Sequence, residues 1–115
     1  MPAALTLHID GLPTSHRIRR ADTWWRRAVG LLTTTALHDP CGLWIAPCGS
    51  VHTFGMRYAI DVVFLDRDNR VLKVVPRLRP WRMAGAARAV ATLELREGLA
   101  EPLGLRPGLQ LSLAA

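Results

Sequence analysis

Cysteine, lysine and long hydrophobic runs are scarce in this sequence. It contains only two cysteines, Cys41 and Cys48, and the six residues between them match neither a CxxC redox motif nor a zinc knuckle. Two cysteines alone cannot complete a structural zinc site, so we expect no metal and no cofactor. No segment approaches the roughly 18 to 20 apolar residues of a membrane span, and the N-terminus lacks the pattern of a signal peptide. We therefore expect a cytoplasmic protein with free thiols and no membrane partner.

Positive charge comes almost entirely from arginine. The chain has 15 basic and 9 acidic residues, a net charge of +6, and Lys73 is its only lysine. Arginine, alanine, leucine and glycine are frequent together, as a GC-rich coding bias would produce in any protein. The net charge therefore says little about a nucleic-acid partner.

Half of the residues are apolar, and 115 residues is a common size for one domain, so we expect a single domain over residues 1–115. Period-two alternation and short apolar runs predict a mainly antiparallel sheet. The expected strands are residues 5–9, 17–21, 43–46, 60–65, 71–75, 90–95 and 109–113. The run at 60–65 is apolar on both faces, which is typical of a central, buried strand.

Two helices are expected beside these strands. Apolar residues at helical spacing predict the main helix at about residues 22–33, and a short helix is expected at about residues 98–104. The predicted fold class is α+β, mainly antiparallel β, with a partly closed sheet or small barrel.

Asp61 opens the buried 60–65 strand and therefore needs a partner. An isolated buried carboxylate costs several kcal/mol, so Asp61 is expected to cap backbone N–H groups or to pair with an arginine. Its surroundings depend on the hairpin register. An even loop places Phe64 opposite Lys73, whereas an odd loop brings Lys73 onto the face of Asp61.

Residues 41–61, CGLWIAPCGSVHTFGMRYAID, hold the densest group of reactive side chains. Cys48 and His52 could form a thiolate and imidazolium pair oriented by Asp61, although Cys48 could equally be a small buried side chain. A metal site built from the same three residues matches no standard ligand pattern.

A second interpretation of this stretch is a groove. Met56 could floor an apolar pocket with Trp44 and Phe54, beside which Arg57 holds an anion bidentately. The competing structural interpretation treats Met56 as a core residue and Arg57 as a solvated arginine.

Arginines and tryptophans also occur near one another, as in proteins that bind single-stranded nucleic acid. The basic residues are Arg17, Arg19, Arg20, Arg26, Arg27, Arg77, Arg79 and Arg82, and the aromatic residues are Trp24, Trp25 and Trp81. Because Trp24 and Trp25 belong to the apolar stripe of the expected helix, we favour core or subunit contacts for them and do not expect a nucleic-acid partner.

Several segments occur in a familiar order: GLL at residues 30–32, then GLWIAPC, VHTFGMRYAIDVVFLDRDNRVLKVV, LELREG and LGLRPG. In these segments the chain, from about Ala21 to Leu113, resembles the bacterial and archaeal family called domain of unknown function 192. The subgroup that it resembles has Pro-Cys, His-Thr-Phe, Met-Arg and Ile-Asp, matched by Pro47, Cys48, His52, Thr53, Phe54, Met56, Arg57, Ile60 and Asp61. The resemblance implies a compact, mainly β fold, and it implies no established activity or cofactor.

We favour a non-catalytic or accessory module over an enzyme. In this hypothesis a groove near Trp44, Phe54, Met56 and Arg57 binds a small anionic or amphipathic ligand, or a partner chain. The alternative is a thiol-dependent enzyme that uses Cys48, His52 and Asp61. The least favoured hypothesis is nucleic-acid binding through the arginine clusters.

Overall fold

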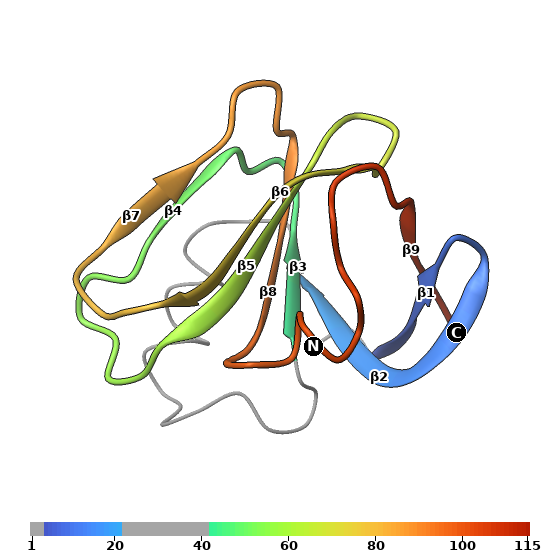
Figure 1. Cartoon of the computed structure of the whole chain (residues 1–115), viewed down its shortest axis with the longest axis horizontal. Coiled ribbons are helices and arrows are strands. Elements are labelled where there is room, and N and C mark those ends of the chain that lie inside the picture. Colours follow the sequence, from blue (N-terminus) through green and yellow to red (C-terminus); the bar gives the residue numbers. More distant parts are fainter. Residues whose placement is uncertain (1–3, 22–41) are drawn as a thin grey trace.

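The computed structural model describes residues 4–21 and 42–115, and within these residues the chain consists of strands joined by turns. The strands are β1 (Leu5–Ile9), β2 (Leu12–Ala21), β3 (Gly42–Ile45), β4 (Ser50–His52), β5 (Ile60–Leu65), β6 (Val71–Leu78), β7 (Met83–Gly85), β8 (Ala91–Arg96) and β9 (Leu111–Ala114). Seven of them form one sheet in the order β6-β5-β8-β3-β2-β1-β9, and β4 pairs with β7 in a separate two-stranded sheet. All pairs are antiparallel except β2 with β3. Figure 1 shows β4 and β7 at one end of the molecule and β1 and β9 at the other.

The large sheet buries both of its faces. On β5 the alternate residues Val63 and Leu65 join one apolar cluster, which also contains Trp44 and the 99–105 segment. Val62 and Phe64 join a second cluster on the opposite face, together with residues of β4 and the 53–57 turn. Every residue of β5 is buried, so the expectation of a central strand apolar on both faces is confirmed.

The β5–β6 hairpin adopts the first of the two registers considered, because Phe64 lies opposite Lys73. Asn69 has a φ of 62°, the left-handed conformation that asparagine tolerates in turns. The register shifts between Ile60 and Val62, which introduces a bulge at the start of β5. That bulge brings the backbone of Arg77 to the carboxylate of Asp61.

The predicted α+β class is wrong, because residues 4–21 and 42–115 contain no helix. The expected main helix at about residues 22–33 lies outside the described residues. The small-barrel alternative is also wrong, because β6 and β9 remain the two edges of an open sheet. A single bridge between Arg70 and Gln110 joins the segments that precede these two strands, and it does not extend into a ladder.

The expected short helix at about residues 98–104 is replaced by a series of turns. Gly98 and Gly104 both have positive φ, at 84° and 67°, so the chain leaves the helical conformation at each end of the segment. The Ala100 N–H donates to Asp61, and Pro102 has no N–H to donate. Leu99 and Ala100 are nevertheless buried, and they cover part of the first sheet face.

Candidate functional site

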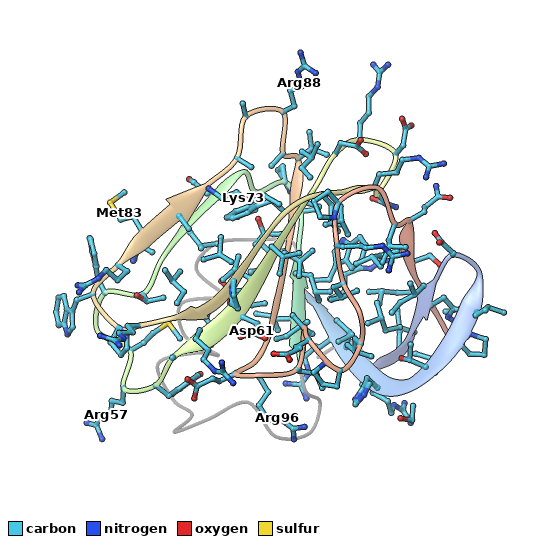
Figure 2. All side chains as sticks on the ribbon, viewed as in Figure 1. Arg57, Asp61, Lys73, Met83, Arg88 and Arg96 are labelled. Carbon is cyan, nitrogen blue, oxygen red and sulfur yellow. The ribbon has the colours of Figure 1, made fainter. Side chains whose placement is uncertain are left out.

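Asp61 is a buried acceptor for three backbone donors. Its Oδ1 accepts hydrogen bonds from the N–H groups of Arg77 (2.9 Å) and Gly98 (3.1 Å), and its Oδ2 accepts one from Ala100 (2.9 Å). The residue is almost fully buried, and Figure 2 shows it in the interior of the molecule. Asp61 therefore fixes the end of β6 and the turn after β8 to the start of β5. Among the interpretations considered from the sequence, this geometry favours capping of backbone N–H groups.

Thr53 is a second buried polar residue that holds the backbone of a distant segment. Its hydroxyl donates to the carbonyl of Arg79 at 2.6 Å and accepts from the N–H of Arg82 at 2.9 Å. The main chain of Thr53 adds bonds to the carbonyl of Arg82 and from the N–H of Trp81. The 79–82 turn is thus clamped to the 53–57 turn, although 26 residues separate Thr53 from Arg79.

The segment held at both of these points lines a pocket. Its walls are Val75, Pro76, Arg77, Leu78, Arg79 and Arg82, and its volume is about 320 Å³. Asp61 fixes the backbone of Arg77, and Thr53 fixes the backbones of Arg79 and Arg82. Among the described residues, none of these three guanidinium groups is paired with a carboxylate. The pocket is therefore lined by three arginines and three apolar residues.

The backbone that carries the pocket is locally strained. Arg77 has a φ of 51° and Trp81 a φ of 65°, values that side-chain-bearing residues rarely adopt. Each such residue costs of order 1–3 kcal/mol, and such conformations cluster at binding sites. The hydrogen bonds of Asp61 and Thr53 stabilise the backbone on either side of these positions.

The three residues of the thiol-enzyme hypothesis are not assembled into a triad. Cys48 donates its thiol to the carbonyl of Ser50 at 3.1 Å. His52 is exposed on β4, and its ring lies 5.0 Å from that of Phe54. Asp61 is engaged with backbone donors and belongs to the opposite face of β5 from the cluster that contains Val51 of β4. Its carboxylate is therefore not placed to orient His52.

The four residues of the expected groove fall in different surroundings. Trp44 is buried in the first apolar cluster, on one face of the large sheet. Met56 is buried in the second cluster, on the other face. Phe54 and Arg57 are exposed, and Figure 2 shows Arg57 at the periphery. The structure thus does not bring Trp44 and Met56 into one groove, and the pocket lies beside β6.

Exposed apolar side chains gather next to this pocket. Phe54, Trp81 and Met83 are 44%, 64% and 70% exposed, and together we call them the apolar tip. The rings of Phe54 and Trp81 are stacked with centroids 5.8 Å apart. Met83 lies opposite His52 in the β4–β7 pair, so the tip is built on the two turns that Thr53 clamps together.

The sequence contained a signal for the pocket, but its position in the fold was missing. Arg77, Arg79 and Arg82 stand out as a cluster near Trp81, and no acidic residue occurs between Asn69 and Leu93. The sequence did not show that Pro76 lies within an edge strand. It also did not show that Thr53 reaches the 79–82 turn. Arg17, Arg19 and Arg20 lie on β2, whereas Arg26 and Arg27 are outside the described residues.

Two other kinds of site are not observed in the part of the chain that the structure describes. No three histidine, cysteine, aspartate or glutamate side chains there are grouped so as to hold a metal ion. No helix within the described ranges is long and apolar enough to span a bilayer.

These features define a mainly β chain with an open sheet and an arginine-lined pocket at its β6 edge. The chain belongs to the DUF192 family, described as Uncharacterized ACR, whose model matches residues 5–113. The resemblance drawn from the sequence is therefore confirmed, and the match begins earlier than the expected start near Ala21.

Relatives and solved structures support this assignment. The chain is 36% identical over 92 residues to a UPF0127 protein of Pyrococcus horikoshii, covering 75% of this chain and 77% of that protein. It is 37% identical over 71 residues to a UPF0127 protein of Thermococcus sibiricus, covering 57% of this chain and 45% of that protein.

Two solved structures are similar in fold. A protein of unknown function from Novosphingobium aromaticivorans matches with a TM-score of 0.80 and 25% identity, covering 95% of this chain and 84% of that one. A putative transcription regulator from Sinorhizobium meliloti matches with a TM-score of 0.81 and 16% identity, covering 96% and 94%. The second likeness concerns the fold alone.

Proposed function

We propose that this protein is a non-catalytic binding module for a small amphipathic anion. The observation that carries the proposal is the pocket of about 320 Å³, which is lined by Arg77, Arg79 and Arg82 together with Val75, Pro76 and Leu78. Its volume is comparable to that of small-molecule sites, roughly 300–1,000 Å³, although the pocket is largely open to solvent. The proposal keeps the ligand class expected from the sequence and moves its site from the groove around Trp44 and Met56 to β6.

The charge of the pocket favours an anion. Guanidinium groups bind carboxylate and phosphate oxygens through paired, charge-assisted hydrogen bonds. Three cationic side chains around one pocket repel one another, and a bound anion relieves that repulsion. Because no described carboxylate pairs with them, the three arginines remain available to an external anion.

The apolar wall favours a ligand with a hydrocarbon part. Leu78 is buried, and Val75 is partly buried in the second apolar cluster, so this wall is continuous with the core. An alkyl chain that covers the wall would gain about 25 cal/mol per Å² of apolar surface removed from water. The fixed backbones of Arg77, Arg79 and Arg82 reduce the ordering cost of binding.

The test is calorimetric titration with octyl phosphate below its micelle concentration. We expect saturable binding that weakens with salt, and at least tenfold weaker binding to the Arg79→Gln and Arg82→Gln variants. The matched control is Arg106→Gln, an exposed arginine of the 104–108 turn, which should bind octyl phosphate like the unmodified protein. Octanol and inorganic phosphate should each bind more weakly, because each lacks half of the ligand.

Two results would count against the proposal. One is binding of octanol as tight as that of octyl phosphate, which would show that the arginines do not contribute. The other is equal loss of affinity in Arg79→Gln and Arg106→Gln, which would show that net charge matters and the pocket does not.

A further inference from the structure

We infer that the apolar tip is a contact surface for an anionic lipid bilayer, on which the protein rests peripherally. The inference extends the proposed function, because it names a phospholipid surface as the source of the amphipathic anion. The expectation of no membrane partner came from the lack of a spanning segment, and a surface contact needs no such segment.

The side chains of the apolar tip are exposed to solvent. Phe54, Trp81 and Met83 are three of five large apolar side chains that are exposed among the described residues. The other two, Leu12 and Val90, lie on the β1–β2 hairpin and just before β8. Contiguous exposed apolar side chains mark interaction sites, whereas single ones are ordinary. Figure 2 shows Met83 and Arg57 at the same end of the molecule, which is the end that carries β4 and β7 in Figure 1.

The tip is held in place by ring stacking and by hydrogen bonds beneath it. Trp81 stacks on Phe54, and the two turns that carry them are joined by the hydroxyl and the main chain of Thr53. Exposed aromatic rings held in this way lose little conformational entropy when they become buried against a partner.

The segments that carry the tip are positively charged. No aspartate or glutamate occurs in residues 46–60 or 75–93, and the same two segments contain five arginines: Arg57, Arg77, Arg79, Arg82 and Arg88. Arg79 and Arg82 flank Trp81 in the chain, and Figure 2 places Arg57 at the same end as Met83 and Arg88 away from it. Apart from the buried Asp61 and Glu94, the carboxylates of the described chain lie on Asp10, Asp66, Asp68, Glu97 and Glu101, outside both segments. Within the described residues, therefore, the segments that carry the tip contribute cations and no carboxylates, and such a surface is attracted to an anionic surface and repels a second copy of itself.

Aromatic rings beside arginines suit the interface of an anionic bilayer. Tryptophan is enriched at the level of the lipid headgroups, and tryptophan and phenylalanine both occur on the apolar faces by which peripheral segments enter the interface, with basic residues beside them. Trp81 lies between the pocket residues Arg79 and Arg82 in the chain, so one short turn offers both the aromatic ring and the cations. Three projecting side chains form a small area compared with the ~800 Å² per partner of a stable protein interface. The geometry therefore favours a bilayer over an acidic protein.

The experiment is co-sedimentation with sucrose-loaded vesicles of phosphatidylcholine alone and of equal parts phosphatidylcholine and phosphatidylglycerol. We expect at least tenfold tighter partitioning to the anionic vesicles, and a loss of at least tenfold in Trp81→Ala and about threefold in Met83→Gln. The control is Leu12→Ala, because Leu12 is as exposed as Met83, at 71%, and lies outside the tip. Circular dichroism and octyl phosphate titration of each variant show whether the fold and the pocket are intact.

The outcomes separate the two proposals. If octyl phosphate binds and the anionic vesicles do not, the membrane inference is overturned and the proposed function stands. If the protein binds the vesicles, Trp81→Ala abolishes that binding and octyl phosphate does not bind, the tip is the membrane contact surface and the pocket is not a ligand site. If Leu12→Ala loses as much binding as Trp81→Ala, the tip is not the contact surface. Tight binding of a soluble poly(Glu,Tyr) copolymer without vesicle binding would overturn the inference in favour of an acidic protein partner.

Discussion

Replacement of Asp61 with asparagine is the sharpest test of the way this fold is held together. Asparagine has nearly the same shape, but only one of the two terminal atoms of its side chain, the amide oxygen, accepts hydrogen bonds. The most favourable orientation places the amide oxygen at the position of Oδ1, where it keeps the bonds from Arg77 and Gly98. The amide nitrogen then faces the N–H of Ala100, a buried donor that is left without an acceptor.

The expected loss in the free energy of unfolding is about 2–4 kcal/mol. An unsatisfied buried donor costs about 1–3 kcal/mol, and the two remaining bonds change from charge-assisted to neutral, which weakens each by about 1 kcal/mol. Relief of the desolvation of a buried carboxylate offsets part of this sum. For a domain whose whole stability is about 5–15 kcal/mol, the loss is easily measured by urea denaturation followed by circular dichroism.

The control for this substitution is Asp66→Asn. Asp66 also accepts two backbone N–H groups, from Asp68 (2.8 Å) and Arg70 (3.0 Å), but both bonds go to Oδ1 in an exposed turn. An asparagine can keep both bonds there, so the expected loss is below about 1 kcal/mol. If Asp61→Asn costs no more than Asp66→Asn, Asp61 is not the buried acceptor that joins β5, β6 and the turn after β8, and the reasoning fails.

Two further predictions follow from the same kind of contact. Thr53→Val should lower the free energy of unfolding by about 1–3 kcal/mol and weaken octyl phosphate binding, because the Arg82 N–H and the Arg79 carbonyl lose their partner. Thr53→Ser keeps the hydroxyl, so it should keep most of the stability in urea denaturation and most of the affinity in calorimetric titration. Gly42→Ala should lower the free energy of unfolding by about 1–3 kcal/mol in urea denaturation, because a Cβ there would lie 2.6 Å from the carbonyl oxygen of Glu94. A loss below about 0.5 kcal/mol, the usual size for a surface substitution, would contradict the close approach of β3 to β8.

The sequence predicted those elements whose pattern is local. The alternation in β1 and the apolar run of β5 identify strands without knowledge of their neighbours. The burial of Asp61 followed from its place at the start of such a strand. The turn residues of the β5–β6 hairpin left two registers open, and the structure selects the one with Phe64 opposite Lys73. In each case a short stretch of chain contains the physical cause of its own structure.

The elements that the sequence did not predict depend on distant partners. β6 continues to Leu78 through Pro76, which would end a central strand, because β6 is an edge strand and one side of it needs no hydrogen bonds. β7 is three residues long and exists through its pairing with β4, about thirty residues earlier in the chain. The 98–104 segment contains helix-favouring Leu, Ala and Glu, but its glycines and Pro102 interrupt a helix, and the backbone of Ala100 is hydrogen-bonded to Asp61. Tertiary contacts overrode local propensity at each of these positions.

The buried polar residues of the 41–61 stretch and the exposed arginines beyond β5 form one arrangement. Asp61 and Thr53 bind the three arginines through backbone groups and not through the guanidinium groups, so they set the path of the chain. No carboxylate of the described residues pairs with these guanidinium groups. Substitutions of the two buried residues should therefore lower stability and affinity together, whereas substitutions of the guanidinium groups should lower affinity alone. A scaffold that existed only to hold the fold together would have no reason to show that separation, because no carboxylate of the described residues pairs with Arg79 or Arg82.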